Sequence, residues 1–195
     1  MNDDEILPPR GLDAIRTDTE RIGFVLASEP KTGALLRGLA ASKPGGRILE
    51  LGTGTGVGTA WLLDGMDDGS RLISVDTDAA VQDVARRHLG HDRRVTFHFG
   101  DGGTFLEEAA QTRFDLIYAD AWPGKFTHLD LALALLKVGG IYFIDDLLPQ
   151  PNWPDGHAAK VPPLIADLES RREFVAVKLA WASGLLMLVR TGAAD

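Results

Sequence analysis

A run of closely spaced glycines is the first feature of this sequence that could form a binding site. Gly52, Gly54, Gly56 and Gly58 alternate with other residues shortly after an acidic residue, Glu50. Glycine lets the backbone turn tightly and lets a ligand approach without meeting a Cβ atom. Where such a turn opens a helix, the unpaired N–H groups of the helix N-terminus favour an anionic group such as a carboxylate. The run therefore predicts a site for a polar ligand.

The spacing of these glycines separates two kinds of nucleotide site. A dinucleotide fingerprint, G-x-G-x-x-G, counted from Gly52 or Gly54 needs a third glycine at position 57 or 59. Val57 and Thr59 occupy those positions. The spacing is G-x-G-x-G instead, which makes a dinucleotide-dependent dehydrogenase the weakest of the candidate functions.

Three aspartates follow later apolar segments. Asp76, Asp101 and Asp120 each stand at or just after the end of a short apolar run. A carboxylate such as Asp76 can accept hydrogen bonds from both hydroxyls of a ribose. Asp101 can cap the next helix, and Asp78, two residues after Asp76, reads as a helix cap as well. If the runs are parallel strands, the three carboxylates gather at one edge of the sheet.

The segments that must position these residues alternate regularly. Apolar runs of strand length predict strands at 47–51, 71–75, 94–99, 114–119 and 141–144. The stretches between them predict helices at 57–66, 78–89, 102–111 and 126–137. The helix 126–137 is expected to be stopped by Gly139-Gly140. Strands alternating with helices are typical of crossover units and a parallel sheet.

The two ends of the chain complete the expected fold. Helical spacing predicts helices at 12–27, from Pro30 onward and at 158–169, while 174–181 and 185–190 predict an antiparallel hairpin. The fold class is therefore α/β: a Rossmann-like, seven-stranded, mostly parallel sheet with an antiparallel C-terminal hairpin and helices on both faces. We expect a single domain, 1–195, with 1–42 as a helical lid segment and 43–195 as the Rossmann-like core.

The segment Glu50-Leu-Gly-Thr-Gly-Thr-Gly56 resembles motif I of methyltransferases that use S-adenosylmethionine (SAM), and the expected sheet resembles that of class I members. The resemblance implies a SAM site at the ends of the first four strands. Its expected cofactor-binding residues are Glu50, Gly52, Thr53, Gly54, Thr55, Gly56, Thr59, Asp76, Thr77, Asp101, Gly102, Asp120 and Trp122.

A closer resemblance covers residues 28–190. The segments 29–36, 119–125 and 144–148 resemble the catechol and caffeoyl-CoA O-methyltransferase family and its bacterial relatives. That resemblance implies a divalent metal such as Mg²⁺ bound by Asp120, Asp145 and Asp146, since hard cations prefer oxygen ligands. The metal would hold a vicinal diol and acidify the hydroxyl that attacks the methyl group.

The sequence departs from this family at two of the implied positions. Asp146 stands where the family usually has Asn, and Pro123 stands where the family's lysine is expected, so that the lysine is Lys125. The resemblance implies Lys125 and Asp120 as catalytic residues. His128, on the same expected helix as Lys125, and His157, after the proline-rich loop expected to fold over the substrate, remain alternative bases.

Composition limits the range of functions further. The chain has 195 residues, a formal net charge of −8 and no cysteine, which excludes disulfides, thiolate metal sites and cysteine nucleophiles. The acidic charge disfavours nucleic acid as a partner, and no apolar run is long enough to span a membrane. We expect a cytoplasmic protein that methylates a hydroxyl of a phenol or catechol-like small molecule. A homodimer is a possible assembly, and the sequence leaves the oligomeric state open. The alternatives are a tRNA or RNA methyltransferase and a non-catalytic SAM-binding sensor.

Overall fold

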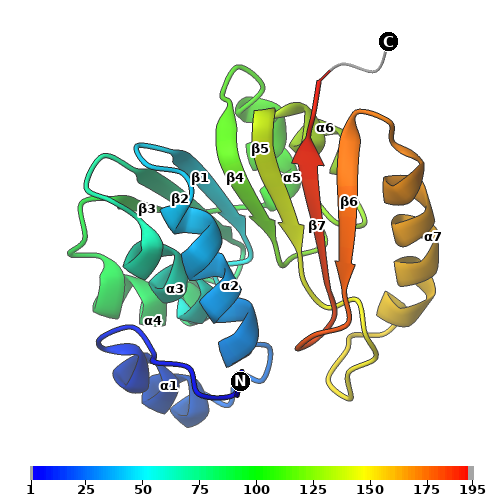
Figure 1. The fold of residues 1–195 in the computed structure, drawn as a ribbon. Coiled ribbons are helices and arrows are strands. Elements are labelled where there is room, and N and C mark those ends of the chain that lie inside the picture. Colours follow the sequence, from blue (N-terminus) through cyan, green and yellow to red (C-terminus); the bar gives the residue numbers. More distant parts are fainter. Residues whose placement is uncertain (1, 193–195) are drawn as a thin grey trace.

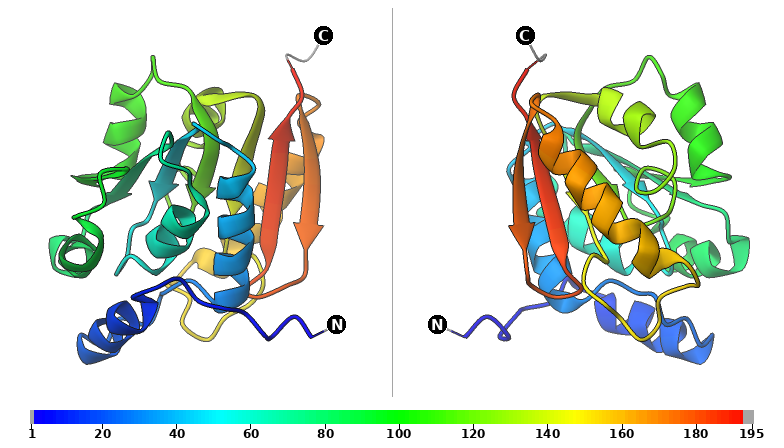
Figure 2. Two further views of the ribbon diagram at one scale, coloured as in Figure 1. Left: turned by 60° about the vertical axis from the view of Figure 1, so that its left-hand side comes forward. Right: turned by 90° about the vertical axis from the view of Figure 1, so that its right-hand side faces the viewer.

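The computed structural model describes residues 2–192 and contains one sheet between two layers of helices (Figures 1 and 2). The sheet has seven strands in the order β3-β2-β1-β4-β5-β7-β6, and only β7 runs antiparallel to its neighbours. The strands are β1 Arg47–Leu51, β2 Arg71–Asp76, β3 Val95–Phe99, β4 Phe114–Ala119, β5 Leu136–Ile144, β6 Phe174–Leu179 and β7 Leu185–Arg190. This architecture confirms the expected fold class.

The helices form the outer layers, with α1 to α4 on one face of the sheet and α5 to α7 on the other (Figure 2). Their bounds are α1 Leu12–Arg21, α2 Pro30–Ala41, α3 Val57–Gly65, α4 Ala79–Leu89, α5 Gly102–Glu108, α6 Leu129–Ala134 and α7 His157–Ser170. Within residues 2–192, none of them combines the length and the apolar character that crossing a membrane requires.

Two apolar cores hold the layers together. Successive side chains of β1 point to opposite faces, so Ile48 belongs to the same core as Trp61, and Leu49 belongs to the other core, with Leu164. All four of these side chains are buried. Burial on both faces explains why the central strands read as continuous apolar runs, and it keeps their carboxyl ends in register where the glycine turn and the aspartates emerge.

The predicted helix 12–27 is wrong in its second half. Helix α1 ends at Arg21, and Gly23 then adopts a φ of +70°. Residue 29 precedes Pro30, which disfavours the helical conformation, and its ψ is 156°. Residues 23–29 therefore run without helical structure between α1 and α2, and we call them the strap.

The predicted helix 126–137 is also too long. Helix α6 ends at Ala134, and β5 begins at Leu136, which pairs with Phe114 of β4 before the register shifts. Gly139 has a φ of +74° and lies inside this irregular strand. The glycine pair thus marks a break in sheet pairing rather than the end of a helix.

Candidate active site

A cavity of about 290 Å³ lies at the carboxyl ends of the parallel strands, and we call it the glycine-turn cavity. It is bordered by the β1–α3 turn, the ends of β2, β3 and β4, and the strap. Its lining includes Phe24, Leu26, Ala27, Ser28, Gly52, Thr53, Gly54, Thr55, Asp76, Thr77, Gly100, Asp101, Gly102, Asp120 and Pro123. This is the edge at which open α/β sheets bind ligands.

The glycine turn is shaped by close backbone contacts. Gly52 has a φ of +101°, and a Cβ placed there would lie 2.6 Å from the backbone oxygen of Asp120. The amide of Gly54 donates a hydrogen bond of 2.8 Å to Oδ2 of Asp76. The turn therefore needs glycine for steric reasons, and it is held against the end of β2 by a carboxylate.

Glu50 lies beneath the turn and is fully buried. Its Oε2 accepts hydrogen bonds of 2.5 Å from the hydroxyls of Thr59 and Ser74, whereas its Oε1 has no partner among the described residues. A Cβ at Gly58 would lie 2.7 Å from that Oε1 atom. Burial raises the pKa of Glu50 to about 8. The structure places Glu50 as a support of the turn, outside the lining of the cavity.

Two further carboxylates line the glycine-turn cavity. Oδ1 of Asp76 accepts a 2.9 Å hydrogen bond from the amide of Asp78. Asp101 caps α5 by accepting from the amide of Thr104 at 2.9 Å, and this backbone hydrogen bond lowers the pKa of Asp101. The expected cap at Asp78 is present as well, since its Oδ1 accepts from two amides of α4. Asp76 and Asp101 are thus both held by backbone amides and still border the cavity.

Most of the predicted cofactor residues come together at this cavity. Those that line it are Gly52, Thr53, Gly54, Thr55, Asp76, Thr77, Asp101, Gly102 and Asp120. Gly56 instead packs on Ala85 of α4, and Thr59 is buried against Glu50. Trp122 lies outside the lining, because its ring packs edge-on against Phe126 and under Lys160.

The sequence reasoning missed the strap as part of the cavity. Phe24, Leu26, Ala27 and Ser28 all line it. The sequence predicts a helix over most of these residues, and a helix would turn their side chains in other directions. The one available signal is the Gly23 and Pro30 pair that brackets the segment.

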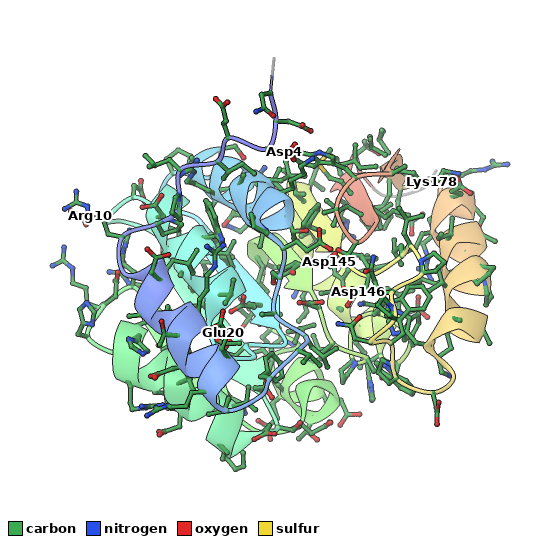
Figure 3. The ribbon with its side chains drawn as sticks, turned by 90° about the horizontal axis from the view of Figure 1, so that it is seen from below. Asp4, Arg10, Glu20, Asp145, Asp146 and Lys178 are labelled. Carbon is green, nitrogen blue, oxygen red and sulfur yellow. The ribbon has the colours of Figure 1, made fainter. Side chains whose placement is uncertain are left out.

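A second cavity of about 250 Å³ adjoins the first and is rich in carboxylates, so we call it the acidic cavity. It is lined by Val25, Leu26, Ala27, Ser28, Glu29, Asp120, Asp145, Asp146, Gln150, Asn152 and Ser183. Figure 3 shows Asp145 and Asp146 near the middle of the lower face. The two cavities share Leu26, Ala27, Ser28 and Asp120, so a group bound in one lies next to a group bound in the other.

Hydrogen bonds join the aspartates of β4 and β5. The hydroxyl of Tyr118 lies 3.1 Å from Oδ2 of Asp120 and 3.0 Å from Oδ2 of Asp145. Oδ1 of Asp145 accepts from the Ser183 hydroxyl and, at 2.7 Å, from the amide of Asp146. Burial and the proximity of the other carboxylates raise the pKa of both Asp120 and Asp145.

The predicted metal site is not formed by these carboxylates. Within residues 2–192 no three His, Cys, Asp or Glu side chains are grouped so as to hold a metal ion. The physical reason is that protein donors already occupy both Asp145 oxygens and that the Tyr118 hydroxyl contacts Oδ2 of Asp120. The set Asp120, Asp145 and Asp146 therefore does not fit the implied Mg²⁺ site, and we derive no step through a metal.

The candidate bases differ in their surroundings. Lys125 is 2% exposed, its Nζ has no ion-pair or hydrogen-bond partner among the described residues, and its charge lowers the pKa of Asp120 and Asp145. His157 is buried against Trp153, Nε2 lies 2.9 Å from the Asp146 carbonyl oxygen, and burial lowers its pKa. His128 instead borders α5, with Nε2 3.9 Å from Glu107. Lys125 and His157 thus lie near the acidic cavity, and His128 lies away from it.

Comparisons with known proteins agree with this geometry. A family model described as a methyltransferase domain matches residues 49–147. A protein named as an O-methyltransferase in Mycolicibacterium smegmatis is 34% identical over 101 residues, which cover 50% of this chain and 48% of that protein. The chain thus aligns with about half the length of this relative.

Solved structures extend the similarity to nearly the whole fold. The O-methyltransferase TomG from Streptomyces achromogenes, involved in tomaymycin synthesis and solved with SAM, has a TM-score of 0.83 and 22% identity, with 96% of this chain and 92% of that one covered. A structure from Klebsiella pneumoniae that is named as an O-methyltransferase has a TM-score of 0.83 and 25% identity, with 97% of this chain and 93% of that one covered. With a family model matching from β1 to the residues after β5, the chain belongs to this methyltransferase domain family.

Proposed function

We propose that this protein transfers a methyl group from SAM to a hydroxyl of a small molecule. The observation that carries the proposal is the junction of two cavities at Asp120 and the strap. One cavity has the glycine turn and carboxylates suited to a nucleoside with a charged tail. The other can hold a second, smaller polar molecule beside it.

The glycine-turn cavity fits SAM by the chemistry of its lining. Asp76 would accept hydrogen bonds from the ribose hydroxyls, and Asp101 would accept from the adenine amino group. The N-terminus of α3 would face the carboxylate of the methionyl part, and the close packing at Gly58 leaves no room there for a side chain. When bound, SAM supplies a methyl group on a positively charged sulfur.

The acidic cavity would orient the acceptor. Asp120 borders both cavities, so its carboxylate can hold the acceptor hydroxyl where the cavities meet. Lys125 is 2% exposed and lies near Asp120. We assign it the uptake of the hydroxyl proton, which its Nζ can accept as a neutral amine, with His157 as the alternative. The strap lines both cavities and would shield the reacting atoms from water. The phenol or catechol-like class of the acceptor rests on the family resemblance alone.

Turnover of SAM to S-adenosylhomocysteine, measured with a panel of catechols, phenols and aliphatic alcohols, tests the proposal. We expect turnover with at least one hydroxyl compound and a loss of about 100-fold or more in kcat when Lys125 is replaced by Met. Lys160→Met is the matched control, because Lys160 lies over Trp122 outside both cavities. SAM binding without turnover of any acceptor would favour the sensor alternative.

We also propose that residues 1–195 act as one domain in which the first 42 residues serve as the lid. The strap supports this view, because it belongs to that segment and lines both cavities. Removal of residues 1–29 should expose both cavities and abolish SAM binding in calorimetry. A homodimer and a cytoplasmic location remain expectations, for which sedimentation of the purified protein and imaging of a tagged protein are the direct measurements.

A further inference from the structure

Tyr118 is a buried side chain whose hydroxyl contacts two aspartates of the acidic cavity and one residue of the strap. It lies on β4, is fully buried and packs against Phe143 of β5 with ring centroids 5.7 Å apart. Residues two apart on a strand point to the same face, so its ring lies on the same side as Asp120. Its hydroxyl reaches the place where β4, β5 and the strap meet.

Three polar groups converge on that one hydroxyl. They are Oδ2 of Asp120, Oδ2 of Asp145 and, at 3.1 Å, the hydroxyl of Ser28 in the strap. A tyrosine hydroxyl carries one hydrogen, which it can donate to one of the two carboxylates at a time, and it can accept from a neighbour such as Ser28. It is therefore a single contact point between the two aspartates and the strap.

The two aspartates depend on this hydroxyl to different degrees. Asp145 keeps Ser183 and the Asp146 amide as further donors. Asp120 has no other side-chain hydrogen bond among the described residues. The orientation of Asp120, the carboxylate that borders both cavities, therefore rests on Tyr118.

Two hydrogen bonds that involve side chains join the strap to other segments around the acidic cavity. Ser28 contacts Tyr118, and the carbonyl of Val25 accepts a hydrogen bond of 2.8 Å from the Asn152 side chain. Asn152 and Ser28 both line the acidic cavity. A closed strap and a correctly oriented Asp120 are thus parts of one hydrogen-bonded arrangement.

We propose that Tyr118 is a positioning residue, which orients Asp120 toward the acceptor and fastens the strap through Ser28. The proposal rests on the proposed methyl transfer for its catalytic part. It assigns to Tyr118 no contact with the reacting atoms. It predicts that loss of the hydroxyl affects the acceptor side of the site more than the cofactor side.

Tyr118→Phe tests this, because the ring and its packing remain while the hydroxyl is lost. We expect kcat/KM for the acceptor to fall roughly 10- to 100-fold, as for loss of a hydrogen bond to a charged group, with the Kd for SAM changed less than about threefold. Tyr142→Phe is the matched control, since it removes a buried hydroxyl that contacts the Gly124 carbonyl instead. An acceptor kcat/KM no lower than in that control overturns the proposal.

A second measurement does not depend on turnover. Cleavage by chymotrypsin after Phe24 or Leu26 reports release of the strap, and we expect it to accelerate several-fold in Tyr118→Phe and in Ser28→Ala but not in Tyr142→Phe. The double variant should be cleaved no faster than Tyr118→Phe. Unchanged cleavage in Tyr118→Phe contradicts the fastening role. If the unmodified protein turns over no acceptor, the proposed function fails, while the cleavage rates still decide this role.

Discussion

At the scale of single residues, Glu50 is an ionisable residue whose charged form is disfavoured by burial. It is fully buried, and only one of its carboxyl oxygens has partners among the described residues. The folded protein holds the Glu50 proton more tightly than the unfolded chain does, because the pKa rises from 4.5 to about 8. Between pH 4.5 and about pH 8, unfolding releases a proton, so the free energy of unfolding falls as the pH rises. Above about pH 8 the whole of this loss of stability is present.

Glu50→Gln should remove this part of the pH dependence. We expect the variant to lose less free energy of unfolding than the unmodified protein between pH 5 and pH 8, by an amount on the order of a few kcal/mol. Urea denaturation at several pH values measures it. Glu108→Gln, an exposed glutamate on α5, is the control and should leave the dependence as it is. Identical slopes for Glu50→Gln and the unmodified protein would contradict the shifted pKa.

Asp76 and Asp78 provide a second comparison between residues. Asp76 lines the glycine-turn cavity, whereas Asp78 caps α4 outside it. We expect Asp76→Ala to weaken SAM binding roughly 10- to 100-fold, because a charged acceptor of hydrogen bonds is lost. Asp78→Ala should cost about 1 kcal/mol of stability as a lost cap, with SAM affinity nearly unchanged. Calorimetric titration with SAM distinguishes them, and equal weakening by both variants would sink the assigned role of Asp76.

At the scale of elements, the backbone conformation of the β1–α3 turn is coupled to the position of Asp120, the residue that follows β4. Gly52 has a φ of +101° and faces the backbone of Asp120 so closely that a Cβ would lie 2.6 Å from its oxygen. The turn and the residue that borders both cavities are therefore packed as one unit. A change in the turn must move Asp120 or strain the backbone.

Gly52→Ala should show this coupling. We expect a loss of about 2–4 kcal/mol in stability, from the left-handed backbone and the contact together, and a parallel loss of SAM binding. Gly139→Ala is the matched control, because Gly139 has a φ of +74° but nothing within 4 Å of its Cβ position. It should cost about 1 kcal/mol and leave SAM binding intact. Thermal unfolding and calorimetry supply both values, and equal losses would show that only backbone strain matters.

At the scale of the whole molecule, SAM bound between the sheet edge and the strap should stabilise the fold. A ligand at 100 times its Kd adds about 2.7 kcal/mol to the free energy of unfolding. For a chain of this size that corresponds to a rise in Tm of roughly 5–10 °C. We expect this rise with SAM and with S-adenosylhomocysteine, and none with NAD, in scanning fluorimetry. A rise with NAD alone would contradict the interpretation of the glycine spacing.

The sequence by itself determined the fold class and most of the glycine-turn cavity. Both follow from local signals: strand-length apolar runs, the spacing from Gly52 to Gly58, and acidic residues such as Asp76 and Asp101 at strand ends. In a parallel sheet these ends must meet at one edge, so position along the chain predicts position in space. The hairpin of β6 and β7 was predictable for the same local reason.

Only the tertiary structure decided how the acidic cavity is built. The strap, Tyr118 and Ser183 come from segments far apart in the chain, and no local pattern marks a hydroxyl as the partner of a distant carboxylate. Sequence placed Asp120, Asp145 and Asp146 at a common edge, but whether their oxygens face a metal or protein donors depends on side-chain packing between strands. Packing also places the Trp122 ring outside the lining of the glycine-turn cavity, and the second half of the predicted helix 12–27 forms the strap instead.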